Sequence, residues 1–297
     1  MANLRDVRLR MRAIKQTLQV TNAMKLISTA KLRKGRRILE DTEPFFTRIQ
    51  KSMYDIVSGS GHGGLESVFF KNTEAMRGSQ SAVVVVTSDK GLAGGYNANL
   101  FREAKKTCEA LSHPALILIG SIGYRYFAHT PYGILENFSF ESRLPTMEDA
   151  QELTDYIISQ YLWGVFKEVH IVYTHMYSTV KLLPRTRQML PLNEDKIQEA
   201  IAQSGGEKRV SIPFEYLPSE SAVFDALIPF YLKGLIYGSL VEAHVSEQSA
   251  RMAAMEEASK NAQEMLDSLG IYYNRVRQAG ITQEVTEIIS GSAVLSE

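Results

Sequence analysis

The placement of proline is the feature that most constrains how this 297-residue chain can fold. All nine prolines fall between positions 44 and 229, so the first 43 and the last 68 residues contain none. A proline inside a helix costs about 3 kcal/mol, and the two ends of the chain are free of that cost. We therefore expect a long helix at each end and a more interrupted fold between them.

The C-terminal stretch has the spacing of a coiled-coil seam. Nine of eleven positions at alternating three- and four-residue steps suit a helix seam, sustained over five heptads. A helix from Ser221 to the last residues would be about 100 Å long, which no compact domain needs. The seam positions are Val241, Val245, Gln248, Met252, Met255, Ser259, Ala262, Leu266, Leu269, Tyr273 and Val276.

The N-terminal stretch has a matching seam. It runs through Leu4, Val7, Met11, Ile14 and Leu18 and then, in our interpretation, shifts to Met24 and Ile27. This pattern predicts a helix over residues 3–57 with a bend near Glu43 and Pro44. Two long helices at opposite ends of a chain can pair antiparallel, each covering the apolar stripe of the other.

The middle of the chain alternates strand-like and helix-like segments. Apolar runs at 81–87, 116–120, 132–140, 169–174 and 179–183 predict strands, and 97–110 and 147–166 predict helices, the second after a capping residue, Thr146. Such alternation predicts an α/β domain with a mainly parallel sheet. The fold class that we expect is α/β with a long coiled coil: an antiparallel two-helix coiled coil from the N- and C-termini, with an inserted Rossmann-like α/β domain. The expected limits are 1–57 for the N-terminal helix, 75–200 for the α/β domain and 220–297 for the C-terminal helix.

The net charge of the whole chain is zero, but the charged residues are unevenly distributed along the sequence. The 33 basic and 33 acidic residues cancel, yet residues 1–37 hold eleven basic residues and one acid, Asp6. This segment carries a net +10 and the remaining 260 residues a net −10. Such a segment could contact nucleic acid, an anionic membrane or an acidic protein surface. The long seam beside it favours the protein surface, and no apolar run approaches the roughly 20 residues that a transmembrane segment requires.

Sites for chemistry are few in this sequence. The turn Gly91–Gly95 follows a predicted strand and precedes a predicted helix, a context that can bind phosphate, but it matches neither common nucleotide-binding motif. A structural turn is the better interpretation. The six histidines lack metal-ligand spacing, and Cys108 is best explained as a buried small residue. An α/β enzyme that dimerises through its helices and a coiled-coil nucleic-acid binder remain alternatives.

Three segments of the sequence form a distinctive set: Thr21–Arg33 in the N-terminal helix, Thr87–Asn97 at the turn after the first strand, and Ile281–Ala293 near the C-terminus. Together they resemble the gamma subunit of rotary F-type ATP synthases. The third segment is the most specific, and Ser246–Met252 adds to the resemblance. Ser292 departs from the alanine usual in that family, and the cysteine-bearing insertion of chloroplast members is missing. The loop 203–210 lies where members vary in length.

The resemblance implies a central rotor shaft that couples c-ring rotation to ATP synthesis or hydrolysis in a ring of alpha and beta subunits. It implies no catalytic residue, cofactor or metal in this chain. The implied partners are alpha, beta, the epsilon subunit and the c-ring, with no nucleic acid and no transmembrane segment. The implied location is peripheral, on the cytoplasmic face of a bacterial plasma membrane. Tyr216 is a candidate for contact with epsilon or the c-ring, and the candidates for contact with beta are Met24, Lys25, Arg33, Arg36, Arg251, Arg277, Gln278, Thr282, Glu284 and Glu287.

Overall fold

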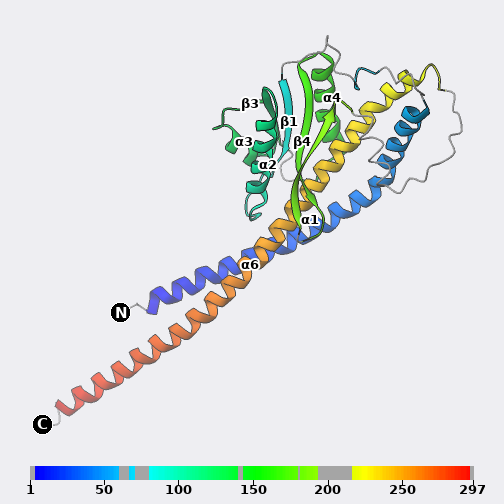
Figure 1. Cartoon of the computed structure of the whole chain (residues 1–297). Helices are drawn as coiled ribbons and strands as arrows, with labels where there is room; N and C mark the ends of the chain where they lie inside the picture. The colour runs from blue at the N-terminus through cyan, green and yellow to red at the C-terminus, as the bar shows by residue number, and fades with distance from the viewer. Residues whose placement is uncertain are drawn as a thin grey trace. The chain divides into compact units, whose positions relative to one another are not determined.

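The computed structural model describes residues 4–59, 67–70, 80–139, 143–179, 181–192 and 216–294 (Figure 1). The chain divides into two compact units. The hairpin unit comprises Met1–Thr29 and Arg251–Glu297, and the α/β unit comprises Ala30–Ala250. The elements are α1 (Leu4–Gly59), β1 (Gln80–Val86), α2 (Tyr96–Ala110), β2 (Pro114–Ile119), α3 (Ser121–Phe127), β3 (Gly133–Phe138), α4 (Met147–Leu162), β4 (Phe166–Met176), β5 (Leu182–Leu190) and α6 (Glu220–Val294).

The α/β unit contains a five-stranded sheet in the order β3-β2-β1-β4-β5. The first four strands are parallel and β5 is antiparallel to β4. The sheet is therefore mainly parallel, as the sequence predicted. Helices cover both faces, which is why β1 is apolar along almost its whole length and buried on both sides. The expected Rossmann-like class is therefore confirmed.

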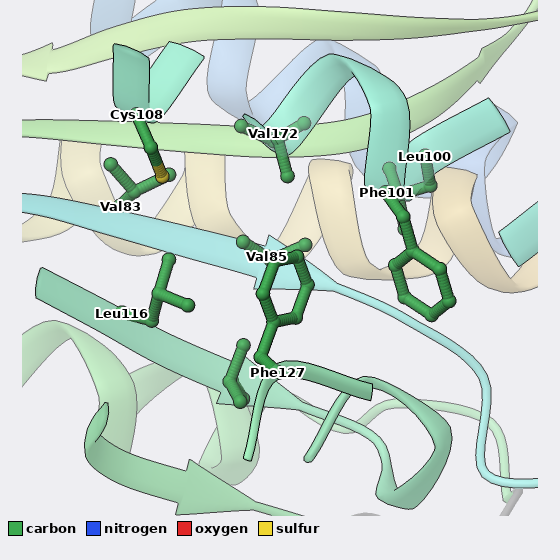
Figure 2. Packing of buried hydrophobic residues seen from close by; sticks show 10 residues of the cluster. Val83, Val85, Leu100, Phe101, Cys108, Leu116, Phe127 and Val172 are labelled. Atoms are coloured by element: carbon green, nitrogen blue, oxygen red, sulfur yellow. The ribbon is translucent and has the colours of Figure 1, made fainter. Parts of the chain in front are cut away.

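One face of the sheet packs on α2 and α3 (Figure 2). Val83 and Val85 of β1 lie in this core with Phe101 of α2 and Phe127 of α3. Because side chains alternate along a strand, the even-numbered residues of β1 point to the other face. There Tyr156 of α4 lies edge-on to Phe138 and Phe166.

Helix α4 begins at the capping residue that the sequence indicated. The Thr146 side chain accepts a hydrogen bond from the Asp149 amide, and the Asp149 carboxylate accepts one from the Thr146 amide. The helix ends at Leu162 and not at the expected residue 166, because the chain turns at Gly164 (φ 73°) and enters β4 at Phe166. A positive φ is a conformation that glycine adopts readily, and it stops the helix.

Two further features of the α/β unit differ from the sequence prediction. The last strand, expected at 179–183, is β5 at Leu182–Leu190, an edge strand that includes Pro184. Helix α3 was not expected, because its seven residues are too few to show a helical period. It follows Gly120 (φ 96°), where an added Cβ would lie 2.5 Å from the carbonyl oxygen of Thr87.

The parts of α1 and α6 that belong to the α/β unit approach each other closely at two glycines. A Cβ on Gly35 would lie 2.5 Å from Val245, and one on Gly234 would lie 2.0 Å from the ring of Phe46.

Helices α1 and α6 continue past Pro44 and Pro229, so these prolines do not mark the ends of the helices. Pro44 is exposed, where water can satisfy the carbonyl that loses its helical partner.

Helix α6 contains the one apolar window that could cross a membrane by length and composition among the described residues. This 18-residue window within Glu220–Ile289 has a mean hydropathy of 1.3, and half of it is buried in the protein. The sequence expectation, based on uninterrupted apolar runs, did not include this window. Phe46 and Phe70 pack on α6 at Tyr237 and Phe224 respectively, so protein contacts cover apolar side chains of this helix.

Candidate functional site

The α6 face of the hairpin unit follows the spacing that the sequence predicted. From residue 252 to residue 280, buried or half-buried side chains recur at steps of three and four, with mostly exposed residues between them. Met255 and Ala262 are the two most buried members. This part of the predicted seam is confirmed.

The α1 face departs from the prediction after Leu18. The expected shift to Met24 and Ile27 is wrong for Ile27, which is 57% exposed, whereas Thr21 and Ser28 are buried. The seam continues in its original register with polar residues in place of apolar ones. The hydroxyl groups of Thr21 and Ser259 lie 2.7 Å apart and form a hydrogen bond, so the polar residue on one helix is matched by one on the other.

The contacts between the two helices share one register. Thr21 meets Ser259, Lys25 donates to Glu256 at 2.7 Å, and Arg8 donates to the hydroxyl of Tyr273 at 2.6 Å. The two residue numbers add up to 280 or 281 in each pair. By this rule Leu4, the first described residue of α1, is level with residue 276 or 277.

Beyond residue 280, α6 has no helix beside it in the described part of this chain. Every residue from 281 to 289 is exposed. This tip, defined as residues 281–294, includes four apolar side chains that are 49–71% exposed. They are Ile281, Val285, Ile288 and Ile289.

The structure divides the predicted contact residues of α1 between the two units. In the hairpin unit, Met24 is half-buried and Lys25 pairs with Glu256 of α6. In the α/β unit, Arg33 is exposed, and Arg36 is half-buried with a guanidinium nitrogen 3.7 Å from the sulfur of Met176. Lys25 is therefore already engaged inside the hairpin, in a pair that water still reaches.

The predicted contact residues of α6 fall into two groups. Arg251 is only 7% exposed, so it must turn outward before it can touch another protein. The others are exposed and lie at or beside the tip, where Thr282 donates back to the Gln278 carbonyl and Glu287 accepts from Gln283. This exposed group consists of Arg277, Gln278, Thr282, Glu284 and Glu287.

Tyr216 lies just before α6 and is half-buried. Partial burial raises the pKa of its hydroxyl, and the negative charges of Asp55 and Glu220 raise it further. The loop 203–210 lies outside the described residues, so the structure gives no surroundings for it.

The glycine-rich turn before α2 has the surroundings of a structural turn. The Tyr96 amide donates to Ala93, and the Tyr96 hydroxyl donates to the carbonyl of Ala243 in α6. The Asp89 carboxylate accepts from the Ser121 amide and the Ser139 hydroxyl in the same region. A carboxylate at this position opposes the binding of phosphate.

Two histidines of the α/β unit pair with carboxylates. His170 pairs with Glu168 at 3.0 Å, and His175 pairs with Glu242 of α6. Burial raises the pKa of Glu242, and His175 partly offsets this effect. Within the described ranges, no cluster of three His, Cys, Asp or Glu side chains is arranged to hold a metal ion.

Sequence reasoning missed the role of Thr21 and Ser259. Ser259 was one of the two polar misfits in the α6 seam, and Thr21 continues the three-four spacing from Leu18. A polar residue at a seam position of both helices was the signal that could have revealed the pair.

Comparisons with known proteins agree over nearly the whole chain. The family model described as ATP synthase matches residues 3–295. The ATP synthase gamma chain of Ruminiclostridium cellulolyticum is 41% identical over 294 residues, covering 99% of both chains. That of Acetivibrio thermocellus is 38% identical, covering 99% of this chain and 100% of its own.

Solved structures show the same fold. A chain of the Euglena gracilis mitochondrial ATP synthase, in a structure of OSCP, F1 and the c-ring, has a TM-score of 0.66 at 18% identity, covering 98% of this chain and 94% of its own. A chain of the Tetrahymena thermophila central stalk and c-ring structure has a TM-score of 0.59 at 21% identity, covering 81% of this chain and 99% of its own. With the sequence relatives and the paired helices described above, these findings establish that this chain belongs to the gamma chain family of ATP synthase.

Proposed function

We propose that this chain works as the central rotor shaft of an F-type ATP synthase. It couples rotation of the c-ring to ATP synthesis or hydrolysis in a surrounding ring of alpha and beta subunits. The observation that carries the proposal is the tip of α6, a helix exposed on all sides that includes four apolar side chains. A helix with exposed apolar residues and no partner needs another protein around it.

The exposed polar residues at the tip suit contacts that form and break. Arg277, Thr282 and Glu284 offer a cation, a hydroxyl and a carboxylate without first leaving a buried partner. Hydrogen bonds to charged groups are worth about 1.5–3 kcal/mol each, so a few of them can hold one rotary position. We assign these residues, with Gln278 and Glu287, to contact with the beta subunits.

The remaining contacts of the proposal use other parts of the chain. Met24, Lys25, Arg33 and Arg36 approach acidic surfaces of beta, and Arg251 joins them only if its side chain turns outward. Tyr216 faces the epsilon subunit or the c-ring. The complex is peripheral, on the cytoplasmic face of a bacterial plasma membrane, and the gamma chain contributes no catalytic residue.

Co-expression with the alpha and beta subunits from the same source tests this proposal. We expect the chain to co-purify with both and to show no ATP hydrolysis when purified alone. Rapid hydrolysis by the isolated chain would refute the proposal and favour the α/β enzyme. Steeply salt-dependent binding of the isolated chain to DNA or RNA would instead favour the nucleic-acid binder.

Substitutions at the tip test the contact residues. Arg277→Ala and Thr282→Ala should each lower ATP synthesis driven by an ion gradient in reconstituted complexes. Gln263→Ala serves as the matched control, because Gln263 is exposed on the same helix and its side-chain amide donates to Asp267 of that helix. An equal effect of all three substitutions would contradict the assignment.

A further inference from the structure

The hairpin unit contains one hydrogen bond between two short side chains across its seam. The Thr21 hydroxyl, in a residue 7% exposed, donates to the Leu18 carbonyl of its own helix at 3.1 Å and lies 2.7 Å from the Ser259 hydroxyl of α6. Other seam residues of the unit include Met11, Met255 and Ala262, which are small or flexible and can pack in several registers. Apolar contacts of this kind do not by themselves select one alignment of two helices.

The two other contacts described above, Lys25 with Glu256 and Arg8 with Tyr273, cannot fix the alignment as firmly. Lys25 and Glu256 are 36% and 61% exposed at their side chains, and exposed ion pairs contribute little and are screened by salt. Arg8 reaches Tyr273 through a long side chain that can follow a displaced partner. Thr21 and Ser259 have short side chains, so their bond is lost after a small slide or roll.

We propose that Thr21 and Ser259 are positioning residues, which fix the axial and rotational register of the hairpin and thereby the place of the α6 tip. This inference rests on the proposed function. A slide of one seven-residue repeat would displace Thr282 and Glu284 by about 10 Å along the axis. Thr21 is buried, so it acts through the tip and not by touching a neighbouring subunit.

The register is tested first in the full chain, without any assay of function. Spin labels at Leu9→Cys and Ile271→Cys, in a Cys108→Ala background, lie on exposed residues that are level with each other by the rule above. The unmodified seam should give one narrow distance distribution, and T21V/S259A a broad one. T21V/S259A removes both hydroxyls together, so neither hydroxyl is left without the other. The Leu18 carbonyl loses the Thr21 hydroxyl but stays within α1, so the helices should remain folded.

The matched control is T17V/S268A. It removes the same atoms from the same two helices, but the Thr17 hydroxyl donates to the Ala13 carbonyl and the Ser268 hydroxyl to the Glu264 carbonyl, each within its own helix. The control should keep the narrow distribution. An unchanged distribution in T21V/S259A would overturn the inference.

Assembled complexes test the consequence of the lost register. With T21V/S259A, ATP-driven ion pumping per ATP hydrolysed should fall by about fivefold, roughly the factor of one ordinary hydrogen bond. Hydrolysis without a gradient should stay near that of the unmodified complex. T21C/S259C, oxidised to a disulfide across the same contact, should keep pumping intact.

The two proposals fail in different ways. Normal pumping by T21V/S259A despite a broad distribution would overturn the positioning role. If complexes with the unmodified chain do not pump at all, the proposed function fails, while the spin-label result still decides the register.

Discussion

Thr87 illustrates, at the scale of single residues, how buried polar groups in this chain find partners on other elements. Its hydroxyl donates to the Ile119 carbonyl at 2.7 Å and accepts from the Gly123 amide at 3.0 Å. A buried polar group without a partner costs about 1–3 kcal/mol, so such matching holds the end of β1 to β2 and α3. Thr21 and Ser259 follow the same rule in the hairpin unit.

Asp149 gives a prediction about acid stability. Burial by itself raises the pKa of this carboxyl, but hydrogen bonds from Arg143 and Thr146 outweigh burial and leave the pKa below its ordinary value of 3.8. A carboxylate of this kind stabilises the fold at neutral pH, and the stabilisation disappears as the pH falls through the lowered pKa. We expect Asp149→Ala to lower the free energy of unfolding at pH 7 by about 1–2 kcal/mol, and by less below about pH 4.

Urea unfolding of the unmodified chain and of Asp149→Ala, each at pH 7 and below about pH 4, measures this difference in unfolding free energy. Glu152→Ala, an exposed substitution on the same helix, is the control and should change stability little. A pH-independent loss in Asp149→Ala would contradict the role of the carboxylate charge.

Cys108 gives a second prediction at this scale. Burial raises the pKa of its thiol to about 11, and the charge of Glu109 adds to the effect. Only about one thiol in ten thousand is then ionised at pH 7, and the thiolate is the reactive form. We expect iodoacetamide to modify Cys108 only after unfolding, as measured by mass spectrometry, whereas a cysteine placed at the exposed position in Ser268→Cys should react at once. Rapid modification of native Cys108 would contradict the packing in Figure 2.

Helix α6 shows, at the scale of elements, how one helix serves different neighbours along its length. In the α/β unit it is largely buried, and its Ser246 side chain donates to the carbonyl of Thr174 at the end of β4. In the hairpin unit it buries side chains along one seam, and at the tip residues 281–289 are all exposed. The apolar residues of α6 are thus buried on most sides in the α/β unit, buried along one stripe in the hairpin unit, and exposed at the tip, because fewer elements pack against the helix along its length.

The close approach of α1 and α6 in the α/β unit gives a prediction for this element. Alanine is favoured over glycine in a helix by about 1 kcal/mol, so Gly238→Ala, where an added Cβ meets nothing within 4 Å, should stabilise the chain by a similar amount. Gly234→Ala places the same methyl group 2.0 Å from the Phe46 ring, and overpacking costs about 1–3 kcal/mol. The two variants, four residues apart on α6, should shift the thermal unfolding midpoint in opposite directions. Equal stabilisation by both would show that Phe46 moves freely.

Charge in the whole molecule is distributed differently from charge along the sequence. The N-terminal segment is strongly basic, but five of its eleven basic residues lie in the α/β unit. The hairpin unit as a whole carries ten basic and eight acidic residues, a net +2. The acidic residues of α6 in this unit, such as Glu256, offset much of the charge of α1. A long-range attraction to any polyanion is therefore weaker than the sequence segment suggested, and local contacts at the tip matter more.

Truncation of the tip is the prediction at this scale. A stop after Gly280 removes a stretch in which residues 281–289 are all exposed, so the unfolding free energy of the chain should change by less than about 0.5 kcal/mol. Coupled ATP synthesis by the assembled complex should fall, because the proposed beta contacts are lost. A stop after Gly270 is the informative comparison, since it also removes the Tyr273 and Val276 seam and should lower stability as well. Unchanged synthesis after the first truncation would contradict the proposed role of the tip.

The local patterns of the sequence determined the elements of this protein. The run at β1, the capping residue Thr146 and the α6 seam were all predicted correctly, because strand burial, capping and helical period depend on neighbours within a few residues. The domain limits at 57, 75, 200 and 220 stay predictions. The assignment of beta, epsilon and c-ring contacts also stays a proposal.

Tertiary structure alone decided which residues meet. Ile27 has an apolar side chain that is exposed, and Thr21 has a polar one that is buried, because the Leu18 carbonyl of its own helix and Ser259 of the other helix both bond to its hydroxyl. Spacing specifies which face of a helix is apolar, but the register between two helices depends on pairs of residues more than 200 positions apart. The sequence determined two long helices and an α/β fold, and the register that exposes the α6 tip was decided only when the helices packed.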